Sequence, residues 1–145
     1  MRSRSRAREA VLQALYQMDV TGAARDDCAE RVARGEDDGE ELTGAAYAYF
    51  KTLFYSITER MDELDKMIEL FSDNWSVERM TVVDRNVLRL AAHELSSPDD
   101  VPFKVVIDEA VELAKRFGTE ESSGFVNGIL DKLAREKGSA DKSAP

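Results

Sequence analysis

Cysteine and histidine are nearly missing from the sequence, which contains one of each, Cys28 and His93. A single cysteine excludes an internal disulfide, and one cysteine with one histidine is too few for a Cys/His zinc site. The sequence also lacks a phosphate-binding loop, a dinucleotide-binding fingerprint and a glycine-framed nucleophile. We therefore expect no catalytic residue, no metal and no cofactor, and we predict that the protein is not an enzyme.

Long apolar runs are absent too, and proline and glycine are scarce. No stretch approaches the ~18 apolar residues of a membrane helix, and no secretory hydrophobic region is visible. Three prolines and eight glycines in 145 residues leave long stretches free for helix. With 43% hydrophobic and 34% charged residues, the composition is that of a globular protein with a core. We expect a cytoplasmic protein without membrane contact.

Apolar residues recur at three- and four-residue spacing along most of the chain, and no segment sustains the alternation of a strand. The fold class is therefore predicted to be all-α, with about seven helices in two small helical bundles. We expect one domain over 1–138, with halves at about 1–72 and 76–138, and a disordered tail at 139–145. The predicted helices cover 5–19, 27–34, 46–71 with a bend near 56–59, 76–95, 102–117 and a final helix that begins after 119–123. Gly118 suits the left-handed position after a helix end.

Charge is distributed unevenly along the chain. The first eight residues, MRSRSRAR, contain four arginines and no acid, whereas the whole chain has a net charge of -9. An acidic body repels nucleic acid, so any nucleic-acid role must be confined to this end. We expect these arginines to fray when unbound and to become ordered on RNA. Two alternatives are a flexible solubilising end and neutralisation by the acidic body.

Other candidate groups have simpler interpretations. The acidic stretch 26–41 holds eight acids and two arginines, and is interpreted as a solvated loop and helix face. The aromatic residues of 47–55 are predicted to be core, with a base-stacking platform as the alternative. His93 lies in an apolar helix and is predicted to be structural. An acid/base pair among the many carboxylates stays open, although no spacing points to one.

Three stretches carry a family resemblance. They are RAREAVLQALYQMD (6–19), DRNVLRLAAHEL (84–95) and VPFKVVIDEAVELAKRFGTEESSGFVNGILDKL (101–133). They resemble the NusB family of bacterial transcription antitermination factors, in order and over nearly the whole chain except 20–45 and the tail. Two positions depart from the usual pattern, because Asp108 stands where asparagine is usual and His93 where tyrosine is frequent.

The resemblance implies an all-helical fold of two small bundles and a function. Members of the family are RNA-binding antitermination factors that bind the boxA sequence in nascent ribosomal RNA transcripts. They act together with NusE, which is also a small-subunit ribosomal protein, and the pair docks with RNA polymerase and other Nus factors. Some members are dimers, so a homodimer is a further state to test.

The resemblance also implies roles for individual residues. RNA-binding residues are expected at Arg4, Arg6, Arg8, Gln13, Glu121 and Phe125, with Arg2 added on composition alone. Partner-binding residues that face NusE are expected at Tyr16 and Asp84.

Each of these roles has an alternative interpretation. Phe125 could instead be core because Ile129 follows four residues later, and Tyr16 and Asp84 could each lie on a solvated helix face. Asn127-Gly128 could be needed for close helix packing. The alternative function is a helical protein-interaction or self-associating module without RNA binding. We expect the arginine-rich start and the ring of Phe125 to share one surface that grips a flexible transcript.

Overall fold

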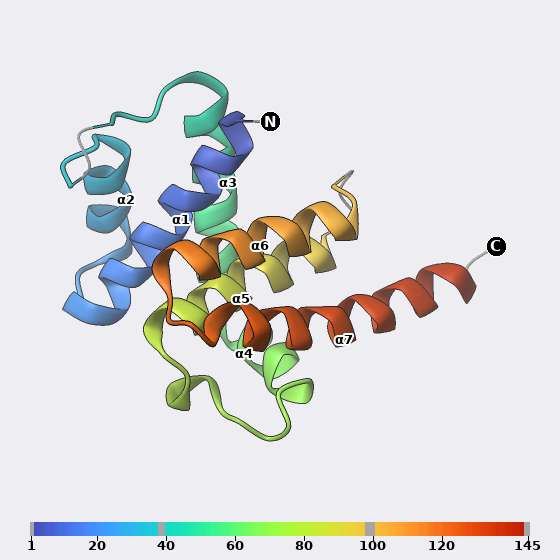
Figure 1. Ribbon diagram of the computed structural model, residues 1–145. Helices are drawn as coiled ribbons and strands as arrows, with labels where there is room; N and C mark the ends of the chain where they lie inside the picture. The colour runs from blue at the N-terminus through green and yellow to red at the C-terminus, as the bar shows by residue number, and fades with distance from the viewer. Residues whose placement is uncertain (1, 38–39, 98–100, 144–145) are drawn as a thin grey trace. The chain divides into compact units, whose positions relative to one another are not determined.

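The computed structural model describes residues 2–37, 40–97 and 101–143, with side chains from residue 3 to residue 136 outside the two gaps. Within these residues it contains helices and no strand, which confirms the all-α prediction (Figure 1). The elements are α1 (Arg2–Thr21), α2 (Arg25–Ala33), α3 (Gly44–Glu59), α4 (Met61–Leu70), a 3-10 turn η1 (Val77–Arg79), α5 (Val82–Ser96), α6 (Phe103–Phe117) and α7 (Ser122–Ser143).

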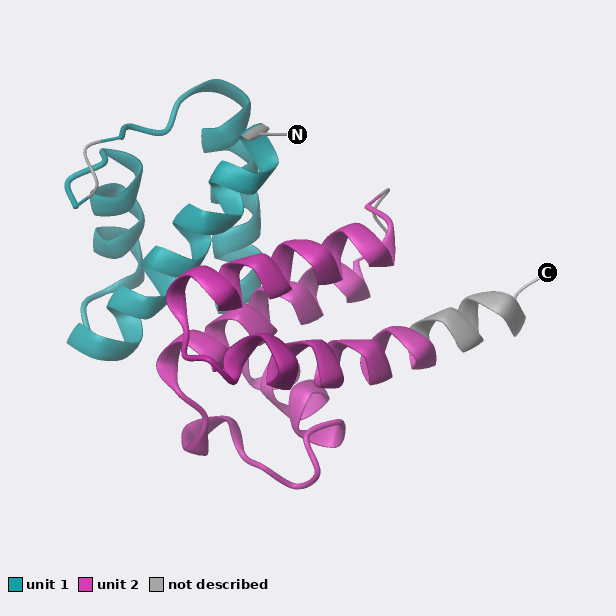
Figure 2. Ribbon diagram, viewed as in Figure 1, with its two compact units in different colours: residues 1–60 teal, residues 61–145 magenta. Residues whose placement is uncertain are grey.

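The chain divides into two compact units, Met1–Arg60 and Met61–Pro145 (Figure 2). The long apolar pattern over 46–71 is split at Arg60, close to the bend expected near 56–59. The boundary of the units also falls at Arg60 and not at 72–75, because α4 packs against α5 within the second unit. The tail predicted at 139–145 lies outside the residues whose side chains are described.

In the first unit, α1 packs against α3 and α2. The buried stripe of α1 is rich in alanine, which lets the neighbouring helices approach closely. Phe50 and Phe54 of α3 are fully buried and stack with their ring centroids 5.6 Å apart. The prediction of a core role is therefore confirmed for these two rings, and neither can serve as a platform for a base.

Tyr55 and Asp26 link α3 to α2 in the same unit. The Tyr55 hydroxyl donates a hydrogen bond to Asp26 Oδ1 at 2.7 Å. This hydrogen bond, with partial burial, raises the pKa of Tyr55 to about 12. The Arg25 guanidinium lies 4.7 Å from the centroid of the Tyr55 ring. The Tyr55 side chain therefore contacts two residues of the first unit, through its hydroxyl and through its ring.

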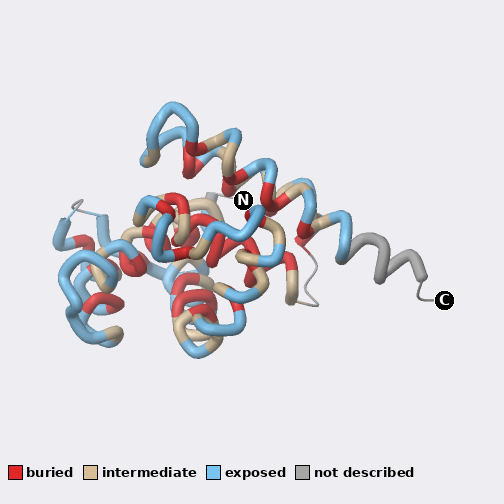
Figure 3. The backbone as a smooth tube through the Cα atoms, turned by 90° about the horizontal axis from the view of Figure 1, so that it is seen from below, coloured by how far each residue is buried: buried red, intermediate tan, exposed pale blue. Residues whose placement is uncertain are grey.

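In the second unit, α5 is the central helix and packs against α4, α6 and α7. Every residue from Asn86 to Leu95 is buried, including the charged ones (Figure 3). A helix that is buried all round belongs to the interior of a protein. His93 is only 8% exposed, which agrees with the structural role expected of it.

The turn between α6 and α7 is stabilised by Thr119 and Ser122. The Thr119 amide donates to Ser122 Oγ at 2.9 Å, and the Glu121 amide donates to Thr119 Oγ1 at 3.3 Å. These bonds satisfy two backbone amides of the turn that precedes Ser122, the first residue of α7. The turn therefore fixes the direction in which α7, the helix that carries Phe125, leaves α6.

Gly118 in this turn is required for a different reason from the one predicted. Its φ of -98° and ψ of -157° are extended backbone, so the predicted left-handed conformation is wrong. A Cβ at this position would lie 2.6 Å from Ser122 Cβ and 2.8 Å from the Ala114 carbonyl oxygen. The close approach of the turn to the end of α6 leaves no room for a larger residue.

In the described part of the chain, no helix is both long and apolar enough to cross a membrane. Among the same residues, no group of three or more His, Cys, Asp or Glu side chains could hold a metal ion.

Candidate nucleic-acid interface

The arginine-rich start is helical, because α1 already begins at Arg2. Arg4 and Arg8 are four residues apart and therefore lie on one face of this helix. Their guanidinium carbons lie 4.7 Å and 5.6 Å from the ring centroid of Tyr49 in α3. In the structure these residues are helical and lie against the ring, where the sequence predicts a frayed start.

Arg6 points to a different neighbour. Its Nε lies 3.3 Å from Glu40 Oε1, and its Nη2 donates to the Glu40 carbonyl oxygen at 3.2 Å. The side chain of Arg6 is 20% exposed and that of Glu40 is 72% exposed. The alternative of neutralisation by the acidic body is therefore correct at this position.

The four arginines differ in accessibility. Arg8 is only 2% exposed, so its guanidinium offers a phosphate almost no surface. Arg4 and Arg6 are half-buried, with part of each side chain open to solvent. The side chain of Arg2 lies outside the described residues. The accessible positive charge described at this end is therefore that of Arg4 and Arg6.

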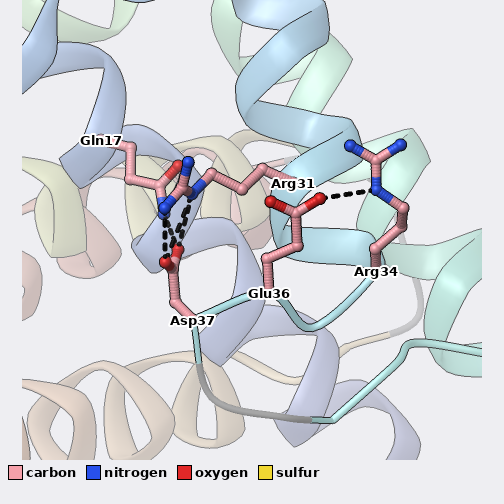
Figure 4. Close-up of polar contacts among 5 residues, drawn as sticks. All are labelled: Gln17, Arg31, Arg34, Glu36 and Asp37. Atoms are coloured by element: carbon pink, nitrogen blue, oxygen red, sulfur yellow. Dashed lines mark hydrogen bonds and ion pairs between the residues drawn. The ribbon is translucent and has the colours of Figure 1, made fainter.

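In the acidic stretch 26–41, interpreted above as a solvated loop and helix face, Glu36 and Asp37 lie in the turn after α2 and make exposed polar contacts (Figure 4). Asp37 accepts hydrogen bonds from Arg31 Nη2 at 3.0 Å and from Gln17 Nε2. Arg34 Nε donates to Glu36 Oε2 at 2.8 Å. The hydrogen bond from Arg31 is the main cause that lowers the pKa of Asp37. These pairs are solvent-exposed, so their effect is mainly to place the loop.

Gln13 and Tyr16 lie further along α1. Gln13 is half-buried, whereas Tyr16 is 43% exposed. Val20, one turn after Tyr16, is 56% exposed. Together Tyr16 and Val20 form an apolar strip on the surface of α1. Such a strip suits contact with another protein better than contact with a phosphate backbone.

Phe125 occupies the start of α7, one turn after Glu121. The Phe125 amide donates to the Glu121 carbonyl oxygen at 3.0 Å, so both side chains lie on the same face of the helix. Glu121 is exposed and Phe125 is half-buried, whereas Val126 and Ile129 are buried. Phe125 is therefore more accessible than the core residues Val126 and Ile129 that follow it.

The glycines beside Phe125 leave the surface around it bare. A Cβ built on Gly124 or on Gly128 meets no other atom within 4 Å. Close packing within the chain therefore does not require Gly128, contrary to the alternative interpretation of Asn127-Gly128. The ring of Phe125 is consequently not covered by side chains from these positions.

Asp84 is placed differently from the other candidates. It is only 7% exposed, and its amide donates to the side chain of Thr81, the N-cap of α5, at 3.1 Å. Its Oδ1 is buried without a hydrogen-bond partner. The solvated-face alternative is wrong for Asp84. Its small accessible area also means that a partner would reach little more than the edge of this carboxylate.

The two residues that depart from the family pattern, Asp108 and His93, have other surroundings than the candidate residues. Asp108 is exposed on α6, where its Oδ2 accepts from Lys104 Nζ at 3.1 Å one turn earlier. It therefore forms a local ion pair of the kind that contributes little to stability. His93 is buried in α5, as described above.

A cavity of about 830 Å³ lies between α2 and α3 in the first unit. Its lining is Asp26, Ala29, Glu30, Ala33, Arg34, Glu41, Leu42, Tyr47, Phe50, Lys51 and Tyr55. No histidine, serine or cysteine lines it, and Asp26 and Arg34 are already engaged by Tyr55 and Glu36.

Two residues of this region were missed by sequence reasoning, Tyr49 and Glu40. Glu40 is 34 positions from Arg6, its partner. Neither residue forms a local sequence motif with the arginines, so residue spacing could not indicate that they are in contact. The resemblance to the family gave no role to either residue.

The described geometry defines a class: an all-α protein of two small units, with helical arginines at the start of one and a half-buried phenylalanine in the other. Family comparison agrees, since the model of the NusB family matches residues 5–135. The transcription antitermination protein NusB of Myxococcus xanthus is 42% identical over 92% of this chain and 96% of its own. That of Anaeromyxobacter dehalogenans is 47% identical over 90% of this chain and 89% of its own.

Solved structures give the same result. NusB of T. maritima is 40% identical with a TM-score of 0.83, covering 92% of this chain and 91% of its own. A structure of the antitermination factors NusB and NusE in complex with dsRNA matches at 29% identity and a TM-score of 0.81. That match covers 94% of this chain and 98% of the other. The chain belongs to the NusB family.

Proposed function

We propose that this protein is an RNA-binding transcription antitermination factor that binds boxA in nascent ribosomal RNA transcripts together with NusE. Membership of the NusB family and a related NusB solved with NusE and dsRNA support this function. The observation that carries the RNA assignment is the ordered cationic start of α1 on a chain with a net charge of -9. The factor acts without catalysis, in the cytoplasm where transcripts form, and reaches RNA polymerase and other Nus factors indirectly.

The role proposed for each residue follows from how accessible its side chain is. Arg4 and Arg6, with Arg2 on composition, meet phosphate oxygens, for which the planar guanidinium is well suited. Phe125 stacks on an unpaired base, with Gln13 and Glu121 as further RNA contacts. Tyr16 contacts NusE through its exposed ring, and Asp84 contributes at most an edge.

Salt dependence tests the RNA assignment first. Each neutralised phosphate on a single strand contributes about -0.7 to the slope of log affinity against log salt, so three arginines predict a slope of about -2. Fluorescence anisotropy with labelled boxA RNA, a scrambled RNA of equal composition, and added NusE provides the measurement. An affinity that changes neither with salt concentration nor with substitutions in boxA would reject the RNA assignment.

Glu40 is expected to weaken RNA binding, because its carboxylate forms an ion pair with Arg6 and competes with phosphate for that guanidinium. Glu40→Gln removes the competing charge while keeping a side chain of similar size, and should raise the affinity for boxA RNA about two- to fivefold at low salt. Glu41→Gln is the matched control, since it makes the same change of charge at an exposed neighbour outside this pair. Equal gains in both variants would mean that general charge, and not the pair with Arg6, is responsible.

The exposed strip of Tyr16 and Val20 also favours a second state, self-association. A homodimer formed through this strip would compete with NusE for the same surface. Sedimentation velocity of the wild type and of Val20→Ser, each with and without NusE, separates the two cases. A dimer that persists in Val20→Ser would place self-association elsewhere.

A further inference from the structure

We propose that Tyr49 is a positioning residue that holds Arg4 in a conformation ready for RNA. The proposal rests on the RNA-binding function above and adds a residue to the same site. Tyr49 lies on α3 and is half-buried, and Arg4 and Arg8 of α1 both lie against its ring. Tyr49 itself is not expected to touch RNA, because arginine side chains already cover its ring.

The two arginines around this ring have different tasks. Arg8 is 2% exposed and belongs to the interior of the first unit. Arg4 is one turn nearer the start of α1, half-buried, and closer to the ring, at 4.7 Å against 5.6 Å for Arg8. Arg8 is therefore the buried neighbour of the ring and helps to fix it, whereas Arg4 is the neighbour that the ring holds near the surface.

Stacking keeps Arg4 competent to bind phosphate. A guanidinium that lies on a ring uses its face, so its N–H donors, which lie in its plane, point away from the ring. An arginine held in this way loses less rotational freedom on binding than a free one, so more of its interaction energy appears as affinity. Arg6 is placed by Glu40 instead of by a ring.

The test combines two substitutions of Tyr49 with two of Arg4. Tyr49→Leu keeps an apolar side chain but removes the ring, and should lower boxA affinity about two- to fivefold, the usual range for an exposed cation–π contact. Tyr49→Phe keeps the ring and should bind as the wild type does. In an Arg4→Ala background, Tyr49→Leu should have no further effect. Arg4→Lys, which keeps the charge but lacks a planar group, should lose most of what Arg4→Ala loses.

Two readouts separate positioning from simple loss of structure. The salt slope of Tyr49→Leu should become shallower by about 0.7, as it does for Arg4→Ala, because one phosphate contact is lost. Partial unfolding would instead reduce the fraction of active protein at an unchanged slope. In the free protein, the Nε–H resonance of Arg4 should move when the ring is removed and stay in place in Tyr49→Phe.

The outcomes distinguish this proposal from the function on which it rests. If the wild type shows no salt-dependent binding to boxA RNA, both are rejected. If the wild type binds while Tyr49→Leu and Arg4→Lys bind equally well, only the role of Tyr49 is rejected. Losses of affinity that add up when Tyr49→Leu and Arg4→Ala are combined also reject the role of Tyr49. So does an Arg4 Nε–H resonance that stays in place when the ring is removed. Circular dichroism confirms folding, and Tyr49→Met, which also removes the ring, decides the matter should Tyr49→Leu fail to fold.

Discussion

Replacing Asp65 with alanine is expected to destabilise the protein by about 3–5 kcal/mol, because it leaves a buried guanidinium without its carboxylate. Asp65 of α4 accepts from Arg89 of α5 at 2.8 Å through Nε and at 3.0 Å through Nη2. The side chains are 19% and 8% exposed. Arg89 Nη1 also donates to Asn86 Oδ1 at 2.9 Å, so the charge is held by a network in the middle of the second unit.

Urea unfolding followed by circular dichroism measures this loss. Asp108→Ala is the matched control, because it breaks the exposed pair with Lys104 and should cost less than about 1 kcal/mol. A double variant, Asp65→Leu with Arg89→Met, should recover most of the stability, since a buried ion pair can be replaced by apolar residues of similar volume. Similar losses for Asp65→Ala and Asp108→Ala would contradict the burial argument.

The network around Arg89 also shows what spacing can predict and what it cannot. Apolar spacing predicted a helix that ends at residue 95, and Val87, Leu90 and Ala91 on this helix are buried. It did not show that Arg89 and Glu94 on the other faces are buried as well. Asp65 and Arg89 are 24 positions apart and on different helices, so only the packing of α4 on α5 brings them together.

The break between the units illustrates the same limit. The apolar pattern continues through Arg60, and the sequence predicted a bend there but not the end of a unit. The unit to which a helix after a bend belongs depends on which other helix it packs against, and α4 packs against α5. Gly118 was located correctly at a helix end, but its role follows from the approach of Ser122, which only three dimensions show.

At the candidate interface, the sequence found the types of residue but not their environments. The resemblance to the NusB family pointed to the arginines and to Phe125. It could not show that Arg8 is buried, that Glu40 occupies Arg6, or that Tyr49 lies against Arg4. These contacts form between α1 and residues more than 30 positions away, where neither periodicity nor a local motif gives a signal.

The largest effect on RNA binding is expected from Phe125→Ala, which should cost about 1–3 kcal/mol of binding free energy with boxA RNA. Phe125 is half-buried at the start of α7, and a Cβ at either neighbouring glycine position would meet open space. The prediction requires a base to stack on the accessible part of this ring. Phe125→Trp keeps an aromatic face and should retain most of the affinity. Anisotropy titration with boxA and scrambled RNA measures both variants.

Phe117→Ala provides the matched control for Phe125→Ala. Phe117 is 45% exposed on α6, in the same unit, with the Arg116 guanidinium 4.8 Å from its ring centroid. Truncating it removes a comparable exposed ring at a position to which no RNA contact is assigned. Phe125→Ala should weaken boxA more than scrambled RNA, because only boxA binds in a register that presents a fixed base to the ring. Equal losses for both phenylalanines would show that exposed apolar area, and not a stacked base at Phe125, accounts for the affinity.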